Sequence, residues 1–409
     1  MTVLADSRLQ DARAQTLALV EGLSDQQLEA VHSPLMSPLV WDLGHIASFE
    51  DLWLAHRRGG MELLHPELAG VYDAFETPRA QRGGLPHLRR AGAERYLEDV
   101  RARVLELGLA DEDPFVELVA RHERQHAETM LQTFALAGLR PMPAAAASAD
   151  EPPPIASSGL AMVDVPGCAS FPLGAAAGDG FAYDNEKPQH RLEVEAFAIG
   201  RVAVTNGDWL AFIDDGGYAR REWWSDAGWR WRTAEAAQRP LHWSADGRER
   251  TLAGARELDP ARPVVHVSAH EADAFARARG VRLPTEAEWE LAASFDGAAE
   301  IKRAPLDANL IESGRFATAR PSSASASPCG ALGMIGDTWE WTSSRFGGYP
   351  GFRADPYPEY SEVFFGGEHR VLRGGSFATS ALVATPTFRN WDYPARRQIF
   401  AGLRVAAPR

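Results

Sequence analysis

A Pro- and Ala-rich stretch divides this chain into two parts that have different residue patterns. Residues 141–159 read P-M-P-A-A-A-A-S-A-D-E-P-P-P-I-A-S-S-G, with five prolines and no helical or strand period. Such a composition is typical of a linker. The chain has 409 residues, a length that suits two domains. We therefore expect a first domain at residues 1–140 and a second domain at residues 160–409.

Before the linker, apolar residues recur four times at the spacing of a helix. The four segments are 8–23, 38–57, 91–107 and 113–136. Ser24 and Gln27 have the spacing of a capping box, which predicts a short additional helix between the first two segments. Several amphipathic helices joined by short connections predict an antiparallel four-helix bundle.

Three histidines face the interior of this predicted bundle. His122 and His126, in R-H-E-R-Q-H-A-E-T-M, are four residues apart and project from one face of their helix. His45, in W-D-L-G-H-I, lies on the apolar stripe of the helix at 38–57, and this stripe is expected to face inward with Trp41, Phe49, Leu52, Trp53 and His56. A divalent metal would satisfy all three buried imidazoles, and helical bundles build metal sites from facing helices. The alternative is a set of core histidines that bond to backbone carbonyls.

The residues alone leave the identity of the metal open. Three neutral imidazoles leave free coordination positions, which suits Fe(II) that binds a substrate and O₂ together; zinc also accepts three histidines and a water. The stretch fits the H-E-x-x-H pattern of zinc metalloproteases as well, with Glu123 as general base. That interpretation requires a further ligand downstream, and no carboxylate follows Glu128 before the linker. A protease is therefore disfavoured.

After the linker, the sequence predicts an α+β domain with long loops. Short strands alternate with turns rich in Gly, Pro, Asn and Asp, as in F-A-I-G-R-V-A-V-T-N. Helical segments are predicted at 206–214, 268–279 and 285–295. Long ordered loops that contain many aromatic residues are typical of a binding surface.

Two segments carry side chains that suit a zwitterionic ligand. In the first domain, Arg79 and Arg82 can offer guanidinium forks to a carboxylate. Near the C-terminus, the segment R-N-W-D-Y-P-A-R-R combines arginine for a carboxylate, aspartate for an ammonium group and tryptophan for a quaternary ammonium. A surface ion-pair cluster is the alternative interpretation of this segment.

Composition excludes several other classes of protein. The formal net charge of −14 and the absence of a Lys/Arg run argue against a nucleic-acid partner. No apolar run approaches the roughly 20 residues of a membrane span, and the N-terminus lacks the pattern of a signal peptide. Two cysteines, Cys168 and Cys329, make no disulfide framework. We therefore expect a cytoplasmic protein.

Motifs from both halves resemble those of the ergothioneine sulfoxide synthases. In the first half these are P-L-V-W-D-L-G-H-I, H-E-R-Q-H-A-E-T-M and the loop with Arg79 and Arg82. In the second half they are R-V-A-V-T-N, D-D-G-G-Y, R-L-P-T-E-A-E-W-E, W-E-W-T-S-S, V-L-R-G-G-S-F and F-R-N-W-D. They follow the family order over nearly the whole chain, although the usual Y-P-W-G-D is missing and G-G-S-W is replaced by G-G-S-F.

The resemblance implies a fold, a cofactor and a reaction. The fold is a DinB-like four-helix bundle followed by a C-type-lectin-like domain of formylglycine-generating-enzyme type, which is expected to form the substrate pocket. A non-haem Fe(II), held by His45, His122 and His126, uses O₂ as co-substrate. The enzymes join the imidazole C2 of hercynine (Nα-trimethylhistidine) to a small thiol and leave a sulfoxide.

The resemblance also implies roles for individual residues in substrate binding and proton transfer. The thiol donor, γ-glutamylcysteine or cysteine, would be held by Arg79, Arg82, Asp392 and Arg396. The trimethylammonium group of hercynine would lie near Gln125, Asn390 and Trp391. The proton-donating tyrosine of the family falls on Tyr357, next to Tyr360, and either tyrosine can instead be a packing residue of the loop.

Several alternatives remain open at this point. The related selenoneine synthases share the scaffold and hercynine but take a seleno-sugar as donor. A zinc-dependent thiol transferase or hydrolase of DinB type, and a catalytically silent module that binds a small molecule, are alternatives of other classes. A structural calcium ion in the second domain is also left open. Cys168 and Cys329 do not match the paired copper site of formylglycine-generating enzymes, which argues against that activity.

Overall fold

The computed structural model describes residues 6–140, 160–295 and 307–409. The chain forms two compact units, Met1–Ala144 and Ala145–Arg409. The predicted linker lies outside the described residues, and the domain boundaries stay predictions. Among the described residues, no helix has the length and apolar character needed to cross a lipid bilayer.

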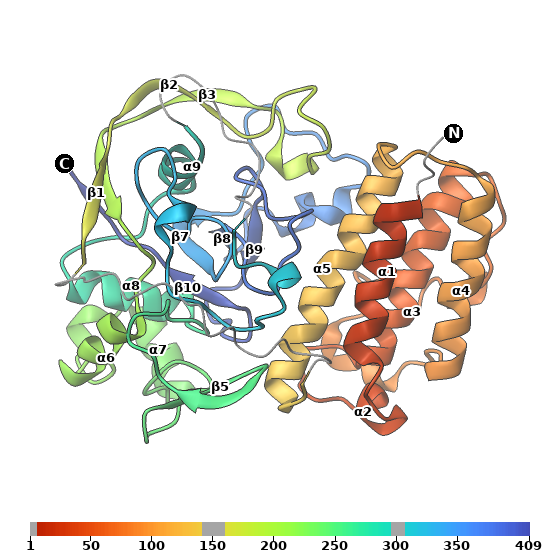
Figure 1. The fold of residues 1–409 in the computed structure, drawn as a ribbon, viewed down its shortest axis with the longest axis horizontal. Coiled ribbons are helices and arrows are strands. Elements are labelled where there is room, and N and C mark those ends of the chain that lie inside the picture. Colours follow the sequence, from red (N-terminus) through yellow and green to blue (C-terminus); the bar gives the residue numbers. More distant parts are fainter. Residues whose placement is uncertain (1–5, 141–159, 296–306) are drawn as a thin grey trace. The chain divides into compact units, whose positions relative to one another are not determined.

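The described part of the first unit has four long helices, which lie side by side in Figure 1. They are α1 (Asp6–Val20), α3 (Leu39–Glu50), α4 (Arg90–Glu106) and α5 (Pro114–Ala137). Helix α3 packs against both α4 and α5, and α1 packs against α5. The predicted bundle is confirmed, and its helices begin and end within a few residues of the predicted positions.

Local capping explains where two of the helices begin and end. The backbone N–H of Gln27 donates to Ser24 Oγ, and the N–H of Ser24 donates to Gln27 Oε1, which completes the predicted capping box of α2 (Asp25–Glu29). The Asp113 side chain accepts a hydrogen bond from the first turn of α5. Gly138 ends α5 in the left-handed region at φ 70°, a conformation that glycine adopts without strain.

Helix α3 continues beyond Glu50 as a π-helical segment, Asp51–Arg58. A π-helix closes its hydrogen bonds over five residues instead of four. The wider turn shifts the side chains after Glu50 away from α-helical spacing, and the effect reaches His56 at the end of the segment. The prediction that His56 faces inward with Trp41 and His45 is wrong, because His56 is exposed while the other two are buried.

One charged side chain from each long helix joins a buried network, formed by Arg13, Glu50, Arg101 and Glu123. Arg13 Nη2 donates to Glu50 at 2.7 Å, and Arg13 Nε donates to Glu123 at 2.8 Å. Arg101 donates to both oxygens of Glu50, at 2.6 and 3.0 Å. Burial alone would raise the pKa of Glu50, but the two guanidinium groups outweigh it and hold this pKa below its ordinary value.

The described part of the second unit is built from small sheets. Strands β1 (Met162–Val165), β4 (Phe197–Gly200) and β11 (Ala406–Pro408) form an antiparallel sheet in the order β1-β4-β11. Strands β10 (Ala401–Leu403), β7 (Trp339–Arg345), β8 (Arg370–Arg373) and β9 (Asn390–Asp392) form a second sheet in the order β10-β7-β8-β9, in which only the β10–β7 pair is parallel. Two further antiparallel pairs join β2 (Cys168–Leu173) to β3 (His190–Val194) and β5 (Arg248–Thr251) to β6 (Gly254–Glu257).

Three of the helices in this unit lie where the sequence predicts them. These are α6 (Asn206–Asp214), α8 (Ala269–Ala278) and α9 (Glu286–Ser294). Helix α7 (Asp226–Ala234) is not predicted, because its sequence D-A-G-W-R-W combines glycine and tryptophan residues of low helix propensity. Ser225 caps α7, and α7 packs against α8, so tertiary contacts outweigh the local preference.

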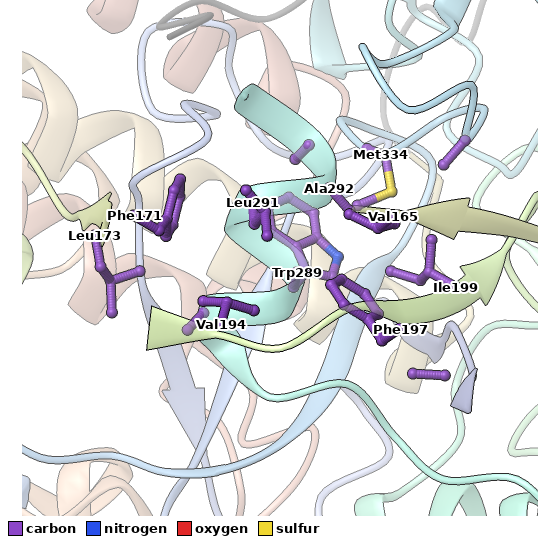
Figure 2. Packing of buried hydrophobic residues seen from close by; sticks show 14 of the residues in the cluster. Val165, Phe171, Leu173, Val194, Phe197, Ile199, Trp289, Leu291, Ala292 and Met334 are labelled. Atoms are coloured by element: carbon purple, nitrogen blue, oxygen red, sulfur yellow. The ribbon is translucent and has the colours of Figure 1, made fainter. Parts of the chain in front are cut away.

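Trp289 of α9 lies in an apolar core cluster of the second unit (Figure 2). Figure 2 shows its indole among Ala292, Phe197 and Ile199, which come from α9 and β4. The indole Nε1 donates to Glu340 Oε2 at 2.6 Å, and Glu340 also accepts from Arg404. The polar atom of this fully buried ring is therefore paired, as burial requires.

We expect Glu50→Gln to lower the free energy of unfolding of the first unit by about 3–5 kcal/mol, because two buried guanidinium groups lose their carboxylate. Urea denaturation of the full chain at neutral pH measures this loss. The contribution of Glu50 is fully present above the ordinary pKa of glutamate. It should disappear as the pH falls through the lowered pKa of the folded state.

Glu94→Gln is the matched control for this measurement. Glu94 pairs with Arg90 at 2.8 Å on the surface of α4, where its side chain is 37% exposed. An exposed pair of this kind contributes less than about 1 kcal/mol. Equal losses in the two variants would contradict a special role for the buried network.

Candidate metal centre

The three predicted histidines lie together inside the first unit. His45 comes from α3, and His122 and His126 come from consecutive turns of α5. One ring nitrogen of each histidine lies within 4.8 Å of the others, and the Nε2 atoms of His45 and His122 are 3.1 Å apart. Among the described residues, no other group of three or more His, Cys, Asp or Glu side chains brings its possible ligand atoms this close together.

Two neighbouring groups determine which nitrogens face the centre. His45 Nδ1 lies 2.7 Å from the backbone oxygen of Tyr72, and His126 Nδ1 lies 3.2 Å from Asp42 Oδ1. Carbonyl and carboxylate oxygens only accept hydrogen bonds, so in both histidines Nδ1 carries the proton. The Nε2 atom of each ring is then the nitrogen with a free lone pair, which is the form that binds a metal.

Burial keeps two of the imidazoles neutral. Desolvation, followed by the neighbouring His126, lowers the pKa of His45 and of His122 well below the ordinary 6.5. A metal competes with a proton for the same lone pair, so a neutral imidazole is ready to coordinate at neutral pH.

Aromatic rings stack on the faces of two of the imidazoles. The indole of Trp41 stacks on His45, with ring centroids 4.9 Å apart and planes 11° apart. Phe49 stacks on His122 at 3.6 Å and 9°. The sequence places both aromatic residues one turn from His45 on the same stripe. In the structure only Trp41 stacks on His45, and Phe49 stacks on His122 of the other helix.

Gly44 allows a close approach between α3 and Tyr72. A Cβ atom at position 44 would lie 2.2 Å from the ring and hydroxyl atoms of Tyr72, so any larger residue must displace that ring. Tyr72 is buried and provides the backbone oxygen that orients His45. Gly44 therefore lets Tyr72 approach α3 closely enough for its backbone oxygen to contact His45.

Glu123 does not have the environment of a general base. It is fully buried, and both of its oxygens accept hydrogen bonds from Arg13, at 2.8 and 3.3 Å. A metalloprotease of H-E-x-x-H type requires this carboxylate at the metal-bound water. The pairing with Arg13 directs it into the bundle instead.

The donor set fits a divalent transition metal. Three imidazole nitrogens converge, and Asp42, the acidic residue in contact with a ligand, hydrogen-bonds to His126. Imidazole donors suit Fe(II) and zinc alike, and three protein ligands leave positions for other molecules. The geometry alone is compatible with both metals.

The first unit places Arg82 and Arg79 in different surroundings. Arg82 is buried, and its Nε, Nη1 and Nη2 atoms donate to Thr77 O, Ser37 Oγ and Ala74 O, which uses three of its five N–H groups. Burial lowers the pKa of Arg82 to about 10, and its guanidinium lies 3.8 Å from the ring centroid of Trp41. Arg79 is exposed. The predicted contacts of both with a substrate carboxylate stay predictions.

Gln125 is half-buried on α5, three residues after His122 and one before His126. This spacing puts it near the side of the helix that carries the ligands. Its predicted contact with a substrate is not tested by the structure.

The second unit gathers aromatic side chains around Trp391 of β9. Trp391 stacks on Phe346 at 4.2 Å and 7°, and the ring of Tyr360 meets it at 5.8 Å and 86°. Tyr360 in turn stacks on Tyr183 at 4.4 Å and 8°, and Tyr357 lies 6.2 Å from Tyr360. Both predicted tyrosines and the predicted tryptophan therefore belong to one aromatic cluster.

Polar residues of the same segment flank this cluster. Asn390 Oδ1 accepts from the backbone N–H of Trp391 at 2.9 Å. Arg396 Nε lies 3.7 Å from Asp392 Oδ1, and both side chains are about one quarter exposed. The pair places one positive and one negative group close together, which fits either of the two interpretations of this segment. The predicted contacts of Asn390, Trp391, Asp392 and Arg396 with a substrate stay predictions.

Sequence reasoning missed Asp42, Tyr72 and Tyr183. Asp42 has a readable signal, because it precedes His45 by three residues and so shares its side of the helix. Tyr72 acts through its backbone oxygen and Tyr183 through stacking on a ring distant in the sequence. Neither contact leaves a pattern in the sequence.

Comparison with known proteins agrees with the two-part architecture. Residues 8–130 match the DinB superfamily, and residues 149–408 match the sulfatase-modifying factor enzyme 1-like domain. The chain is 45% identical to the hercynine oxygenase of Mycolicibacterium thermoresistibile, over 98% of this chain and 93% of that protein. It is 46% identical to the hercynine oxygenase of Mycobacterium tuberculosis, over 97% and 96%. It is also 29% identical to ergothioneine biosynthesis protein 1 of Schizosaccharomyces pombe, over 55% of this chain and 27% of that protein.

The fold and the histidine centre thus define an enzyme in which a DinB-type helical domain is joined to a sulfatase-modifying-factor-type domain. Within that class, the chain belongs to the hercynine oxygenase family. The predicted family and fold class are confirmed. The structural calcium stays a prediction.

We expect Gly44→Ala to weaken metal binding by about 10-fold or more, because the added methyl group must displace Tyr72 and with it the acceptor of His45. Titration with Co²⁺, followed by its visible absorption, measures the affinity. Alanine would otherwise favour a helix by about 0.5–1 kcal/mol over glycine, so helix propensity cannot explain a loss.

Gly70→Ala is the control for this substitution. Gly70 is exposed two residues before Tyr72, and a Cβ atom there would meet nothing within 4 Å. Its affinity for Co²⁺ should match that of the wild type. Unchanged affinity in Gly44→Ala would show that the close approach to Tyr72 does not matter for the centre.

Proposed function

We propose that this protein is an Fe(II)- and O₂-dependent enzyme that forms a C–S bond at the imidazole C2 of hercynine, in ergothioneine biosynthesis. The observation that carries the proposal is a three-histidine centre in a chain about 45% identical, over nearly its full length, to hercynine oxygenases. Hercynine loses the hydrogen on C2 and the thiol donor loses its S–H hydrogen. One atom of O₂ enters the sulfoxide and the other leaves as water.

His45, His122 and His126 would hold the iron. Bound Fe(II) supplies the one-electron chemistry that dioxygen needs to react with closed-shell organic molecules. The backbone oxygen of Tyr72 and the carboxylate of Asp42 keep two ligands in the tautomer that coordinates. Among the described residues no carboxylate belongs to the ligand group, so a bound ion would keep positions at which two reactants could be held side by side.

In this proposal the trimethylammonium group of hercynine binds near Trp391. One face of the indole is covered by Phe346, and the ring of Tyr360 stands at right angles to it. Perpendicular aromatic walls suit a quaternary ammonium, which gains about 0.5–2 kcal/mol from each cation–π contact. Gln125 and Asn390 are further proposed contacts of hercynine.

The donor in this proposal is a small amino-acid thiol, γ-glutamylcysteine or cysteine. Asp392 and Arg396 offer one charge of each sign, which matches an ammonium and a carboxylate group. Arg79, which is exposed, and Arg82 would contribute further contacts with carboxylate. The names of the full-length relatives give no support to a seleno-sugar donor over a thiol.

Tyr357 is the proposed proton donor of the reaction. A phenol near the reacting atoms can deliver a proton to developing negative charge. Tyr360 is the alternative, but its ring is stacked on Tyr183 and in contact with Trp391. We therefore assign Tyr360 to the wall of the hercynine site.

Anaerobic reconstitution tests the proposed reaction. Protein purified without metal is loaded with Fe(II), mixed with hercynine and γ-glutamylcysteine or cysteine, and exposed to air. We expect oxygen consumption and a sulfoxide product whose mass contains hercynine and the donor, and no product from His45→Ala, His122→Ala or His126→Ala. A competing seleno-sugar in the same mixture reports the preferred donor.

The outcome that contradicts the proposal is the absence of any hercynine-derived product with every donor. Turnover with zinc and without oxygen consumption would instead identify a zinc-dependent thiol transferase or hydrolase. Ligand binding that survives all three alanine substitutions, with no turnover, would identify a binding module without catalysis.

We expect Tyr357→Phe to lower kcat by about 100-fold or more, because it removes the hydroxyl of the proposed proton donor and keeps the ring. Tyr360→Phe keeps the aromatic wall and should lower kcat by less than about 10-fold. Affinity for Co²⁺ should be unchanged in both variants. The reverse order of the two kcat values would assign the proton donor to Tyr360.

A further inference from the structure

Asp42 is a buried carboxylate that contacts a metal ligand from the opposite helix. It lies on α3 and is fully buried. Its Oδ1 accepts a hydrogen bond from His126 Nδ1 of α5 at 3.2 Å. Its Oδ2 is also buried and has no hydrogen-bond partner among the described residues.

A carboxylate in this position needs a positive charge nearby. Removing an ion from water costs several kcal/mol, which an opposite charge or a full set of hydrogen bonds must offset. Arg82 is close enough for its charge to interact with Asp42, but its donors are directed to Thr77, Ser37 and Ala74. The bonds within the described residues therefore leave the charge of Asp42 only partly compensated.

The metal centre has the opposite imbalance. Three neutral imidazoles bring no negative charge to a divalent ion, and no carboxylate belongs to the ligand group. Asp42 is one hydrogen bond away from His126 and can provide that charge without taking a coordination position. Carboxylate–histidine–metal arrangements of this kind raise the basicity of the ligand and fix its ring.

We propose that Asp42 is the positioning and charge-compensating residue of the metal centre. It fixes the proton of His126 on Nδ1, turns Nε2 toward the other two ligands, and balances part of the charge of the ion. His45 receives its orientation from an uncharged acceptor, the Tyr72 carbonyl, so Asp42 is the residue through which charge reaches the centre. This inference rests on the proposed metal site but does not depend on hercynine as substrate.

Asp42→Asn separates charge from shape. The amide keeps an oxygen that can accept from His126 Nδ1 and has nearly the same volume, but it carries no charge. The affinity of the full-length protein for Co²⁺ and the urea midpoint of unfolding with and without Co²⁺ are measured. Asp42→Leu, which also removes the acceptor, is measured in the same way and provides the second variant.

We expect Asp42→Asn to bind Co²⁺ about 10- to 100-fold more weakly than the wild type, and Asp42→Leu to bind it more weakly still. The metal-free variants should unfold at the wild-type urea midpoint or above it, because a partly compensated buried charge has been removed. The stabilisation that Co²⁺ confers should therefore shrink even though the metal-free protein is no less stable.

Asp51→Asn is the matched control. Asp51 is an equally buried aspartate of the adjoining π-helical segment, where it accepts from Leu64 N at 2.8 Å and from Tyr96 at 3.1 Å. It should lower the unfolding midpoint with and without metal and leave the affinity for Co²⁺ unchanged. If Asp42 had a purely structural role, Asp42→Asn would give the same result as Asp51→Asn: a lower unfolding midpoint with and without metal, and unchanged affinity for Co²⁺.

Two results would overturn the inference. Wild-type affinity for Co²⁺ in both Asp42 variants would show that neither the charge nor the acceptor matters to the centre. Equal destabilisation of the metal-free and metal-loaded Asp42 variants, as for Asp51→Asn, would make Asp42 a structural residue. If the wild type itself binds neither Co²⁺ nor Fe²⁺, the proposed metal centre fails along with the role of Asp42.

Discussion

Arg13 joins the two helices on which the candidate metal centre depends. It donates to Glu50 of α3 and to Glu123 of α5, and all three side chains are nearly or completely buried. Glu50 directly follows Phe49, which stacks on His122, and Glu123 directly follows His122. The ionic network therefore sets the separation of α3 and α5 beside the ligands. A buried pair is costly to break, so the spacing of the three imidazoles is held firmly.

The contacts of individual residues explain two short motifs of the first unit. In W-D-L-G-H, Trp41 stacks on His45, Asp42 bonds to His126, and Gly44 makes room for Tyr72, whose carbonyl orients His45. In H-E-R-Q-H, the two histidines are ligands of the candidate centre, and the glutamate belongs to the structural network. The same letters that describe a metalloprotease helix thus serve a different chemistry, because Arg13 occupies the carboxylate.

The second unit shows how an aromatic cluster is assembled from distant segments. Tyr183, Tyr360 and Trp391 lie in three separate parts of the sequence, yet their rings form one cluster. Strand β9 holds Trp391 in a sheet with β8 and β7, and Phe346 covers one face of its ring. Rigid strands can present polar and aromatic groups at fixed angles, which a mobile loop cannot do.

The sequence by itself determined the helical bundle, the strand-rich second half, and the three histidines, because a period of 3.6 residues and a spacing of four are local properties of a chain. It also placed Asn390, Trp391, Asp392 and Arg396 in one segment. Only the tertiary structure decided that His56 turns outward, that α7 forms, that Glu123 faces Arg13, and that Asp42 and Tyr72 contact His126 and His45. Most of these outcomes depend on contacts with side chains or backbone of another helix or strand. Such contacts between elements leave no periodic pattern along the sequence.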